Sequence, residues 1–293
     1  MMTNIESAAK KKFRRFDCTL IECIRETPDT ATLVLATKEN RDYRAGQFVS
    51  IDPGQFPALA RWARFLEKLK GRKEPPRMYS LASAPFEEHL AVTIKEEEYF
   101  PDEDEYPPLL SPFLAHRITV GTPVTVMGYA GHYHLPDRVE DLTDHIVHIC
   151  SGSGVVPNYG MIKQALHDNL KIRHTLFYGN KRFEDIIYFR QFEALANRHP
   201  DKVRIIHAIT REDNPERRGS AFRKGRISDA LIREAVTDIA APIFFCCGSA
   251  VSAWQKKRHR EKGTEPTPKF MDTLIPLLES MGVRKDRIFK ESW

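Results

Sequence analysis

The pattern of apolar residues changes near residue 140, and this change restricts the possible folds more than any other feature. Before it, short segments rich in β-branched and aromatic residues alternate with turns, as in an antiparallel β-barrel. After it, strand-length apolar segments alternate with helical ones, which predicts a doubly wound parallel sheet. A chain of 293 residues is long enough for two such domains. We therefore predict a two-domain β + α/β protein, with a disordered segment at 1–12, a barrel at 13–140 and an α/β domain at 141–293.

The expected barrel strands span 17–24, 30–36, 47–51, 77–82, 90–95 and 123–128. In the α/β half, we expect strands at 145–150, 173–178, 203–209, 243–247 and 287–290. Helices are expected from the turn after the first of these strands to about 169, and at 184–198, 228–236 and 268–281. A short helix is also expected near residue 111, with Ser111 as its N-cap and Pro112 in its first turn.

Two segments interrupt the barrel pattern. Residues 57–73 predict a helix with apolar side chains on one face (Trp62, Phe65, Leu66, Leu69) and cations on the other (Arg61, Arg64, Lys68, Lys70). Such a helix either docks on a partner or membrane surface, or covers the barrel with its apolar face. We favour the second interpretation, because apolar stripes usually pack inward. The acidic segment 96–108 reads as a solvated surface loop.

Composition limits the classes of function. The net charge of +5 comes without the alternation of aromatic and basic residues that supports single-strand binding, so we do not expect a nucleic-acid partner. No apolar run is long enough to span a bilayer, so we expect no integral membrane segment. Five scattered cysteines indicate a cytoplasmic protein without an iron–sulfur cluster of its own. His132 and His134 lack further ligands nearby, so no metal site is predicted.

The segment 77–85 combines a cation, an aromatic ring and hydroxyl groups. Arg77 can pair with a phosphate through its planar fork of donors. Tyr79 can lie flat on a planar heterocycle, and Ser80 can hydrogen-bond the edge of that heterocycle. These three features together describe a flavin nucleotide site. An edge strand with an exposed arginine and a half-buried tyrosine is the alternative.

The glycine-rich turn 151–157 follows the first strand of the second half and opens a helix. Gly152 and Gly154 would let a pyrophosphate approach backbone N–H groups at the helix N-terminus. Pro157 takes the position of the last glycine in the usual dinucleotide-binding motif. The alternative is an ordinary tight turn between strand and helix.

Two arginines lie where the third parallel strand ends and shortly after it. Arg211 follows that strand directly, at the edge where open α/β sheets bind ligands, and Arg226 lies in the next loop. Together they indicate a phosphate on the nucleotide ribose, hence NADP rather than NAD. Alternatively both are solvated loop charges, since other arginines lie nearby. Cys247 ends the next strand at the same edge and is a candidate to line the hydride-transfer pocket, whereas Cys246 is expected to be an inert core residue.

In their order along the chain, these motifs resemble the ferredoxin–NADP⁺ reductase family, and the resemblance extends from about residue 16 to residue 293. It depends on Arg77-Met78-Tyr79-Ser80, Leu110-Ser111-Pro112, Gly152-Ser153-Gly154 with Pro157, Thr210-Arg211-Glu212, Gly225-Arg226-Ile227, Cys247-Gly248 and the terminal Trp293. The family's fold is an FAD-binding antiparallel barrel followed by a nicotinamide-nucleotide domain, in agreement with the pattern above.

The resemblance implies a role for each matching residue. The FAD would be held by Arg77, Met78, Tyr79 and Ser80, by Thr93, Ile94 and Lys95 on the neighbouring strand, by Ser111 and by a stacked Trp293. The nicotinamide nucleotide would be held by Gly152, Ser153, Gly154, Val155 and Pro157, by Arg211 and Arg226 at its 2′-phosphate, and by Gly248 at the nicotinamide. The residues nearest the reaction would be Tyr79, Ser80, Cys247 and Glu291.

The implied activity is an FAD-dependent reductase that moves electrons between NADPH and a one-electron carrier such as ferredoxin, flavodoxin or another iron–sulfur protein. An NADH-dependent reductase component of an oxygenase system, or a flavin-bearing subunit of a larger redox complex, is the alternative. The chain departs from the family at Pro108 and at Ser249-Ala250. Residues 57–73 and 254–268 are basic insertions, and we expect them to form a dock for an acidic carrier.

Overall fold

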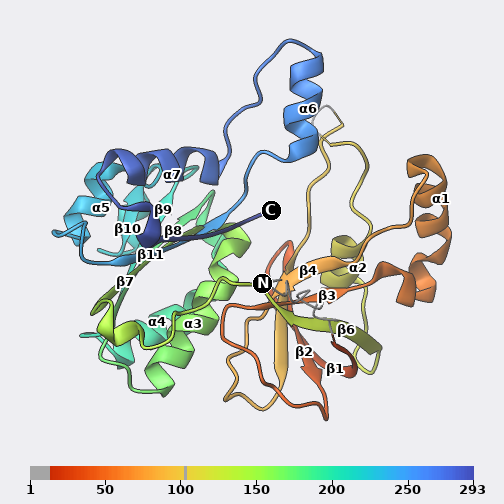
Figure 1. Cartoon of the computed structure of the whole chain (residues 1–293), viewed down its shortest axis with the longest axis horizontal. Helices are drawn as coiled ribbons and strands as arrows, with labels where there is room; N and C mark the ends of the chain where they lie inside the picture. The colour runs from red at the N-terminus through yellow and green to blue at the C-terminus, as the bar shows by residue number, and fades with distance from the viewer. Residues whose placement is uncertain (1–13, 102–103) are drawn as a thin grey trace, which may run out of the picture.

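The computed structural model describes residues 14–101 and 104–293. Its architecture is two six-stranded sheets, one antiparallel and one parallel (Figure 1). The predicted fold class is therefore confirmed. The disordered segment predicted at 1–12 lies outside the described residues, and the domain boundary at residue 140 stays a prediction.

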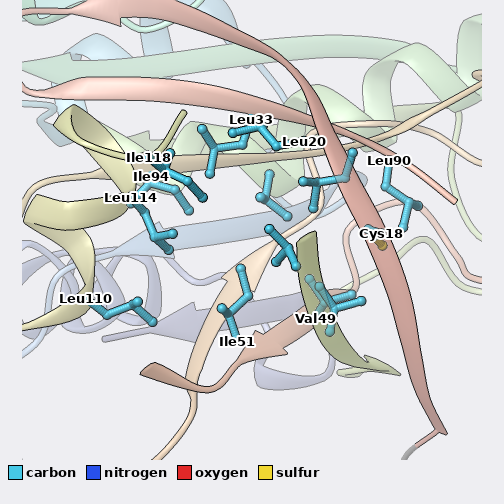
Figure 2. Packing of buried hydrophobic residues seen from close by; sticks show 14 of the residues in the cluster. Cys18, Leu20, Leu33, Val49, Ile51, Leu90, Ile94, Leu110, Leu114 and Ile118 are labelled. Atoms are coloured by element: carbon cyan, nitrogen blue, oxygen red, sulfur yellow. The ribbon is translucent and has the colours of Figure 1, made fainter. Parts of the chain in front are cut away.

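The antiparallel sheet has the order β4-β3-β6-β1-β2-β5. Its strands are β1 (Arg14–Thr27), β2 (Thr30–Ala36), β3 (Phe48–Ile51), β4 (Arg77–Ser80), β5 (Leu90–Lys95) and β6 (Pro123–Ala130). A bridge between Leu81 and Val92 joins the two edge strands and closes the sheet into a barrel. Alternate residues of these strands point inward, and α2 (Leu110–His116) adds Leu110 and Leu114 to the core (Figure 2).

The parallel sheet has the order β10-β9-β8-β7-β11-β12. Its strands are β7 (His145–Ser151), β8 (Arg173–Asn180), β9 (Val203–Ile209), β10 (Phe222–Lys224), β11 (Ile243–Gly248) and β12 (Ile288–Ser292). Its helices are α3 (Val155–His167), α4 (Phe189–Arg198), α5 (Asp229–Ala235), α6 (Ala253–Glu261) and α7 (Phe270–Ser280). The strand order reverses between β7 and β11, and ligands of doubly wound sheets bind outside the carboxyl ends of strands at such a point.

Helices cover both faces of the parallel sheet. Buried residues of α3 and α4 pack on one face, and buried residues of α5 and α7 pack on the other. Local capping helps to define where helices begin: the Ser228 hydroxyl accepts from the N–H of Leu231 at 3.3 Å, which starts α5. Ser252 and Gln255 form a reciprocal capping box at the start of α6.

The barrel packs closely against α3. Gly160 of α3 faces backbone carbonyls of the segment that follows β4, and a Cβ atom at this position would lie 3.3 Å from the Leu81 oxygen. The Lys163 ammonium of the same helix pairs with Glu87 of the barrel domain. A buried hydrogen bond joins the hydroxyls of Thr93 and Tyr188 across the same boundary. These contacts set the end of β4 against the α/β half of the chain.

Several local predictions were wrong. Ser111 does not cap α2: it lies inside the helix, buried, and its hydroxyl accepts from the N–H of Glu97 at 3.2 Å. The helix predicted at 184–198 is a 3₁₀ turn at Phe183–Asp185 followed by α4. Neither β10 nor α6 was predicted from the sequence. Both elements are short and carry many charged residues, so neither has a clear apolar period.

The orientation predicted for the helix within 57–73 was also wrong. That helix is α1 (Ala60–Lys70), and its buried residues are Ala63 and Leu66. The side chains of Trp62, Phe65 and Leu69, expected to pack on the barrel, are exposed. The helical period predicted the apolar stripe correctly, but of its four residues only Leu66 is buried.

Candidate functional site

The predicted flavin segment forms β4, an edge strand that pairs antiparallel with β3. Arg77 and Met78 are exposed, whereas Tyr79 and Ser80 are half-buried. The Arg77 guanidinium lies 3.7 Å from a carboxylate oxygen of Glu74, and 44% of the Arg77 side chain remains exposed, against 3% for Glu74. A buried carboxylate therefore holds the arginine in place while leaving donors free for a phosphate.

Ser80, Cys247 and Glu291 meet at the boundary between the two domains. The Ser80 hydroxyl donates to Oε2 of Glu291 at 3.3 Å, although the two residues are 211 positions apart in the chain. Strand β12 pairs with β11 so that Glu291 is the register partner of Cys247. The structure thus brings together three of the four residues predicted to lie nearest the reaction, and Tyr79 is adjacent to Ser80 on β4.

Burial shifts the pKa of Glu291 strongly. It raises the pKa from 4.5 to about 7, while the hydrogen bond from Ser80 acts in the opposite direction. A carboxyl with a pKa near 7 can both accept and release a proton at neutral pH, as a general acid or base requires.

Cys247 is fully buried at the end of β11, and its side chain is on the sheet face that packs towards the barrel. Burial, and then the neighbouring Glu291, raise the pKa of its thiol well above the usual value. The group is therefore a neutral thiol rather than a thiolate nucleophile. Cys246 points to the opposite face, among residues of α7, as expected for a core cysteine.

The turn that follows β7 and the end of β11 pack so closely that neither Gly154 nor Gly248 has room for a side chain. A Cβ atom on Gly154 would lie 2.2 Å from the carbonyl oxygen of Cys247. A Cβ atom on Gly248 would lie 2.5 Å from the Phe270 ring and 2.8 Å from the Ser151 hydroxyl. These two glycines therefore serve the close packing of the backbone. Gly152 is different, because a Cβ atom there would meet nothing within 4 Å, and this half-buried turn at the N-terminus of the 13-residue helix α3 suits the pyrophosphate of a dinucleotide.

Two buried side chains that were not predicted from the sequence hold the glycine turn in place. Asn158 donates to the carbonyl of Gly154 at 2.7 Å, and Tyr178 donates to the carbonyl of Gly152 at 3.0 Å. Asn158 also accepts from the Tyr133 hydroxyl at 3.1 Å. The sequence offered one signal, because an asparagine one turn into an otherwise apolar helix is unusual without a buried partner.

Arg211 and Arg226 are both exposed beyond the carboxyl ends of β9 and β10. Among the described residues, neither has an ion-pair partner, whereas the neighbouring Arg218 and Arg223 pair with Glu212 and Glu234. Strand β8 ends at Asn180, followed by Lys181. The acidic residue that binds the ribose hydroxyls of NAD is thus missing at that strand end.

A cavity of about 770 Å³ lies beside Arg211, between the two domains. Its lining includes Lys181, the acidic stretch 96–98, and the rings of Tyr99 and Phe100. Residues 96–100 and 107–108 of the predicted surface loop therefore form one wall of a cavity next to the candidate nucleotide phosphate site.

Other candidate side chains bond mainly within the protein. The Thr93 hydroxyl is hydrogen-bonded to the hydroxyls of Thr32 and Tyr188, and the Ser111 hydroxyl to the N–H of Glu97. Lys95 forms an ion pair with Asp29. Ile94, in the barrel core, and Val155 are fully buried. Any contact of Ile94 or Val155 with a cofactor is therefore through backbone atoms. Trp293 is 52% exposed, with its carbonyl accepting from the N–H of Ala250 at 3.0 Å. The residue is therefore accessible to a stacking partner.

The residues present fit a flavin and a dinucleotide. An exposed guanidinium, a half-buried tyrosine ring and a polar pair lie along the end of β4, and a glycine turn opens α3 in the other domain. Within residues 14–101 and 104–293, no group of three or more His, Cys, Asp or Glu side chains is placed to hold a metal ion. No helix in the same ranges is long and apolar enough to cross a membrane.

Residues 148–253 match the family model of the oxidoreductase NAD-binding domain. Among curated proteins, the chain is 24% identical over 182 residues to a nitrate reductase [NADH] of Volvox carteri, covering 58% of this chain and 19% of the relative. It is 28% identical over 157 residues to NADH-cytochrome b5 reductase 2 of Aspergillus niger, covering 50% and 44%. The chain thus spans half or less of the length of these relatives.

Solved structures of low sequence identity share the fold across nearly the whole chain. The FAD/NAD-binding domain of nitric oxide dioxygenase from Vibrio cholerae superposes with a TM-score of 0.69 at 19% identity, covering 95% of this chain and 98% of that one. Ferredoxin–NADP⁺ reductase from Plasmodium falciparum gives a TM-score of 0.62 at 16% identity, covering 95% and 96%. These similarities confirm the arrangement of a barrel followed by a nucleotide-binding sheet.

Proposed function

We propose that this chain is an FAD- and NAD(P)-binding oxidoreductase of the ferredoxin–NADP⁺ reductase family, and that it moves electrons between NADPH and a one-electron carrier protein. One observation carries the proposal: Ser80 of the flavin strand bonds Glu291, the register partner of Cys247, at the end of the nucleotide-binding sheet. The elements proposed to bind the flavin and the nicotinamide would thus meet at one point between the domains.

Bound there, FAD would supply the link between two-electron hydride chemistry and one-electron transfer. Arg77, Tyr79 and Trp293 would bind and orient the flavin, and the glycine turn at the N-terminus of α3 would hold the nicotinamide nucleotide. Glu291, with its pKa near 7, would hold or release a proton at its carboxylate oxygen next to the Ser80 hydroxyl. The buried thiol of Cys247 would exclude water from this side of the site.

We propose NADPH as the preferred nucleotide. The support is the pair of unpaired arginines, Arg211 and Arg226, together with Asn180-Lys181 in place of an acidic residue. NADH is the second candidate, because the curated relatives are named as NADH enzymes.

The carrier is proposed to be ferredoxin, flavodoxin or another small redox protein. A reductase component of an oxygenase is the second candidate, and a solved ferredoxin reductase of carbazole 1,9a-dioxygenase shares the fold with a TM-score of 0.67 at 17% identity. A flavin-bearing part of a larger redox protein is the third, since the chain covers only 19% of its nitrate reductase relative. The cytoplasm is the proposed compartment, because all five cysteines are free thiols.

An anaerobic absorbance titration of the purified protein with NADPH, then with NADH, tests the redox function and the nucleotide together. We expect a flavin spectrum that bleaches with NADPH first. Arg211→Ala with Arg226→Ala should lower kcat/KM for NADPH about a hundredfold or more in dye reduction, because each of the two charge-assisted phosphate contacts is worth roughly 1.5–3 kcal/mol. The double variant should leave NADH turnover nearly unchanged. Arg217→Ala, an exposed arginine of the same loop, is the control. A colourless protein, or an equal loss for both nucleotides, would refute the proposal.

A further inference from the structure

Helix α1 presents three large apolar side chains to solvent. The exposed fraction is 62% for Trp62, 52% for Phe65 and 55% for Leu69. Spacings of three and four residues put them on one side of the helix. The rings of Trp62 and Phe65 touch edge to face, with centroids 6.0 Å apart. They therefore form one contiguous apolar patch, which is costly to leave in water.

The attachment of α1 to the barrel prevents this patch from turning inward. Ala63 and Leu66 are buried on its other side, α1 contacts the 3₁₀ turns that precede it (Pro53–Gln55 and Pro57–Leu59), and Lys70 at the end of the helix pairs with the buried carboxylate of Glu74. Figure 1 shows α1 at the outer edge of the barrel domain, on the side away from the parallel sheet. The patch thus belongs to a helix fixed at the periphery of the molecule.

Cations border the patch. Arg61, Arg64 and Lys68 lie along one side of it, and Arg72 and Lys73 follow the helix end, all exposed. In the described part of the chain, none of these five has an ion-pair partner. The one acidic residue of the helix, Glu67, accepts from the backbone N–H of Glu74 and does not pair with them. The positive charge is therefore available to an external anion.

From this combination we propose that α1 docks the protein on the surface of a membrane rich in anionic phospholipid. An interfacial helix needs aromatic and aliphatic side chains that enter the headgroup boundary and Lys or Arg beside them at the phosphates. The patch and its border supply both. An acidic protein would match the cations but leave the protruding rings without a preformed pocket, whereas a lipid surface accommodates both. This proposal is independent of the redox function.

The binding is peripheral, since one short helix with three inserting side chains gives reversible attachment. The cytoplasmic leaflet, with its anionic lipids, attracts each nearby cation by about 1 kcal/mol. A reductase attached through α1 would be held next to membrane-bound electron carriers without any spanning segment of its own.

Sedimentation of the flavin-loaded full chain with vesicles tests the proposal. We expect binding to phosphatidylcholine vesicles that contain phosphatidylglycerol and little binding to phosphatidylcholine alone. Replacing Arg61, Arg64 and Lys68 by Gln should lower the partition coefficient of the protein on the vesicles about a hundredfold, because each of the three cations contributes about 1 kcal/mol. Replacing Trp62, Phe65 and Leu69 by Ala should weaken it at least about tenfold. Quenching of tryptophan emission by brominated phospholipid should be lost in Trp62→Phe.

The matched control is Lys256→Gln with Arg260→Gln and Lys262→Gln, which removes equal charge from α6 and its end. NADPH–dye turnover of every variant separates this proposal from the redox function, because α1 takes no part in the site. No binding of the intact protein to anionic vesicles, or equal losses from the α1 and α6 cation variants, would overturn the proposal. One more result would overturn it: the α1 variants bind vesicles as the wild type does, but lose self-association of the protein or deliver electrons more weakly to an acidic carrier. That result would assign the patch to a protein partner.

Discussion

The raised pKa of Glu291 makes the stability of the protein depend on pH in a predictable direction. Its folded-state pKa of about 7, compared with 4.5, means that the folded protein holds this proton more firmly than the unfolded chain. The contribution of this protonated carboxyl to the free energy of unfolding is fully present below pH 4.5 and is lost as the pH rises through 7. At about 1.4 kcal/mol per pKa unit, the loss amounts to about 3 kcal/mol.

Glu291→Gln removes this dependence because the amide does not titrate. Urea denaturation of wild type and variant, measured from below pH 4.5 to above pH 7, should show the variant gaining up to about 3 kcal/mol relative to wild type across that range. Glu193→Gln, an exposed glutamate of α4 without an ion-pair partner in the described chain, should show no such change. Ser80→Ala should move the midpoint of the dependence to higher pH, because the lost hydrogen bond had favoured the carboxylate.

The same carboxyl should govern turnover near neutrality. In the proposed role, the pH profile of kcat for dye reduction should contain a group near pH 7 that is absent from Glu291→Gln. If wild type and variant have parallel stability curves and identical pH profiles, Glu291 is ionised normally and the reasoning from its burial is wrong.

Two further changes test the glycine turn and the domain boundary. Gly154→Ala should destabilise the protein by about 1–3 kcal/mol in urea denaturation and raise KM for the nucleotide, because the added methyl group would lie 2.2 Å from a carbonyl oxygen. Gly179→Ala is the control: its methyl group would have no atom nearer than 3.6 Å, so stability and kinetics should stay close to those of the wild type. Tyr188→Phe should cost about 1 kcal/mol by removing the buried bond to Thr93, whereas Tyr129→Phe should be nearly neutral, because the Tyr129 hydroxyl is buried without a hydrogen-bond partner.

Where local pattern decides structure, the sequence was a good guide. The bounds of β2, β5 and β9 agree with those expected, since each is a short run of β-formers ended by turn residues. The order of barrel and parallel sheet, and the glycine turn after β7, also followed from period and spacing. The individual roles of the candidate site residues stay predictions until the titrations and variants above are measured.

Other features were beyond local reasoning because they depend on which surfaces meet. The period of α1 indicated an apolar stripe, but only packing decided that Leu66 is buried and Trp62 faces solvent. Ser111 had the sequence context of a helix cap, yet the chain before it continues as helix and turns its hydroxyl towards Glu97.

The sequence by itself thus determined the two-domain architecture and the chemical kinds of residue available, because hydrophobic period, turn residues and glycines act over a few positions. Only the tertiary structure decided that Ser80 and Glu291, 211 positions apart, share a hydrogen bond, and that the Glu291 carboxyl is buried enough to titrate near neutrality. The physical reason is that hydration and contact depend on how the domains pack, and no short stretch of sequence contains that information.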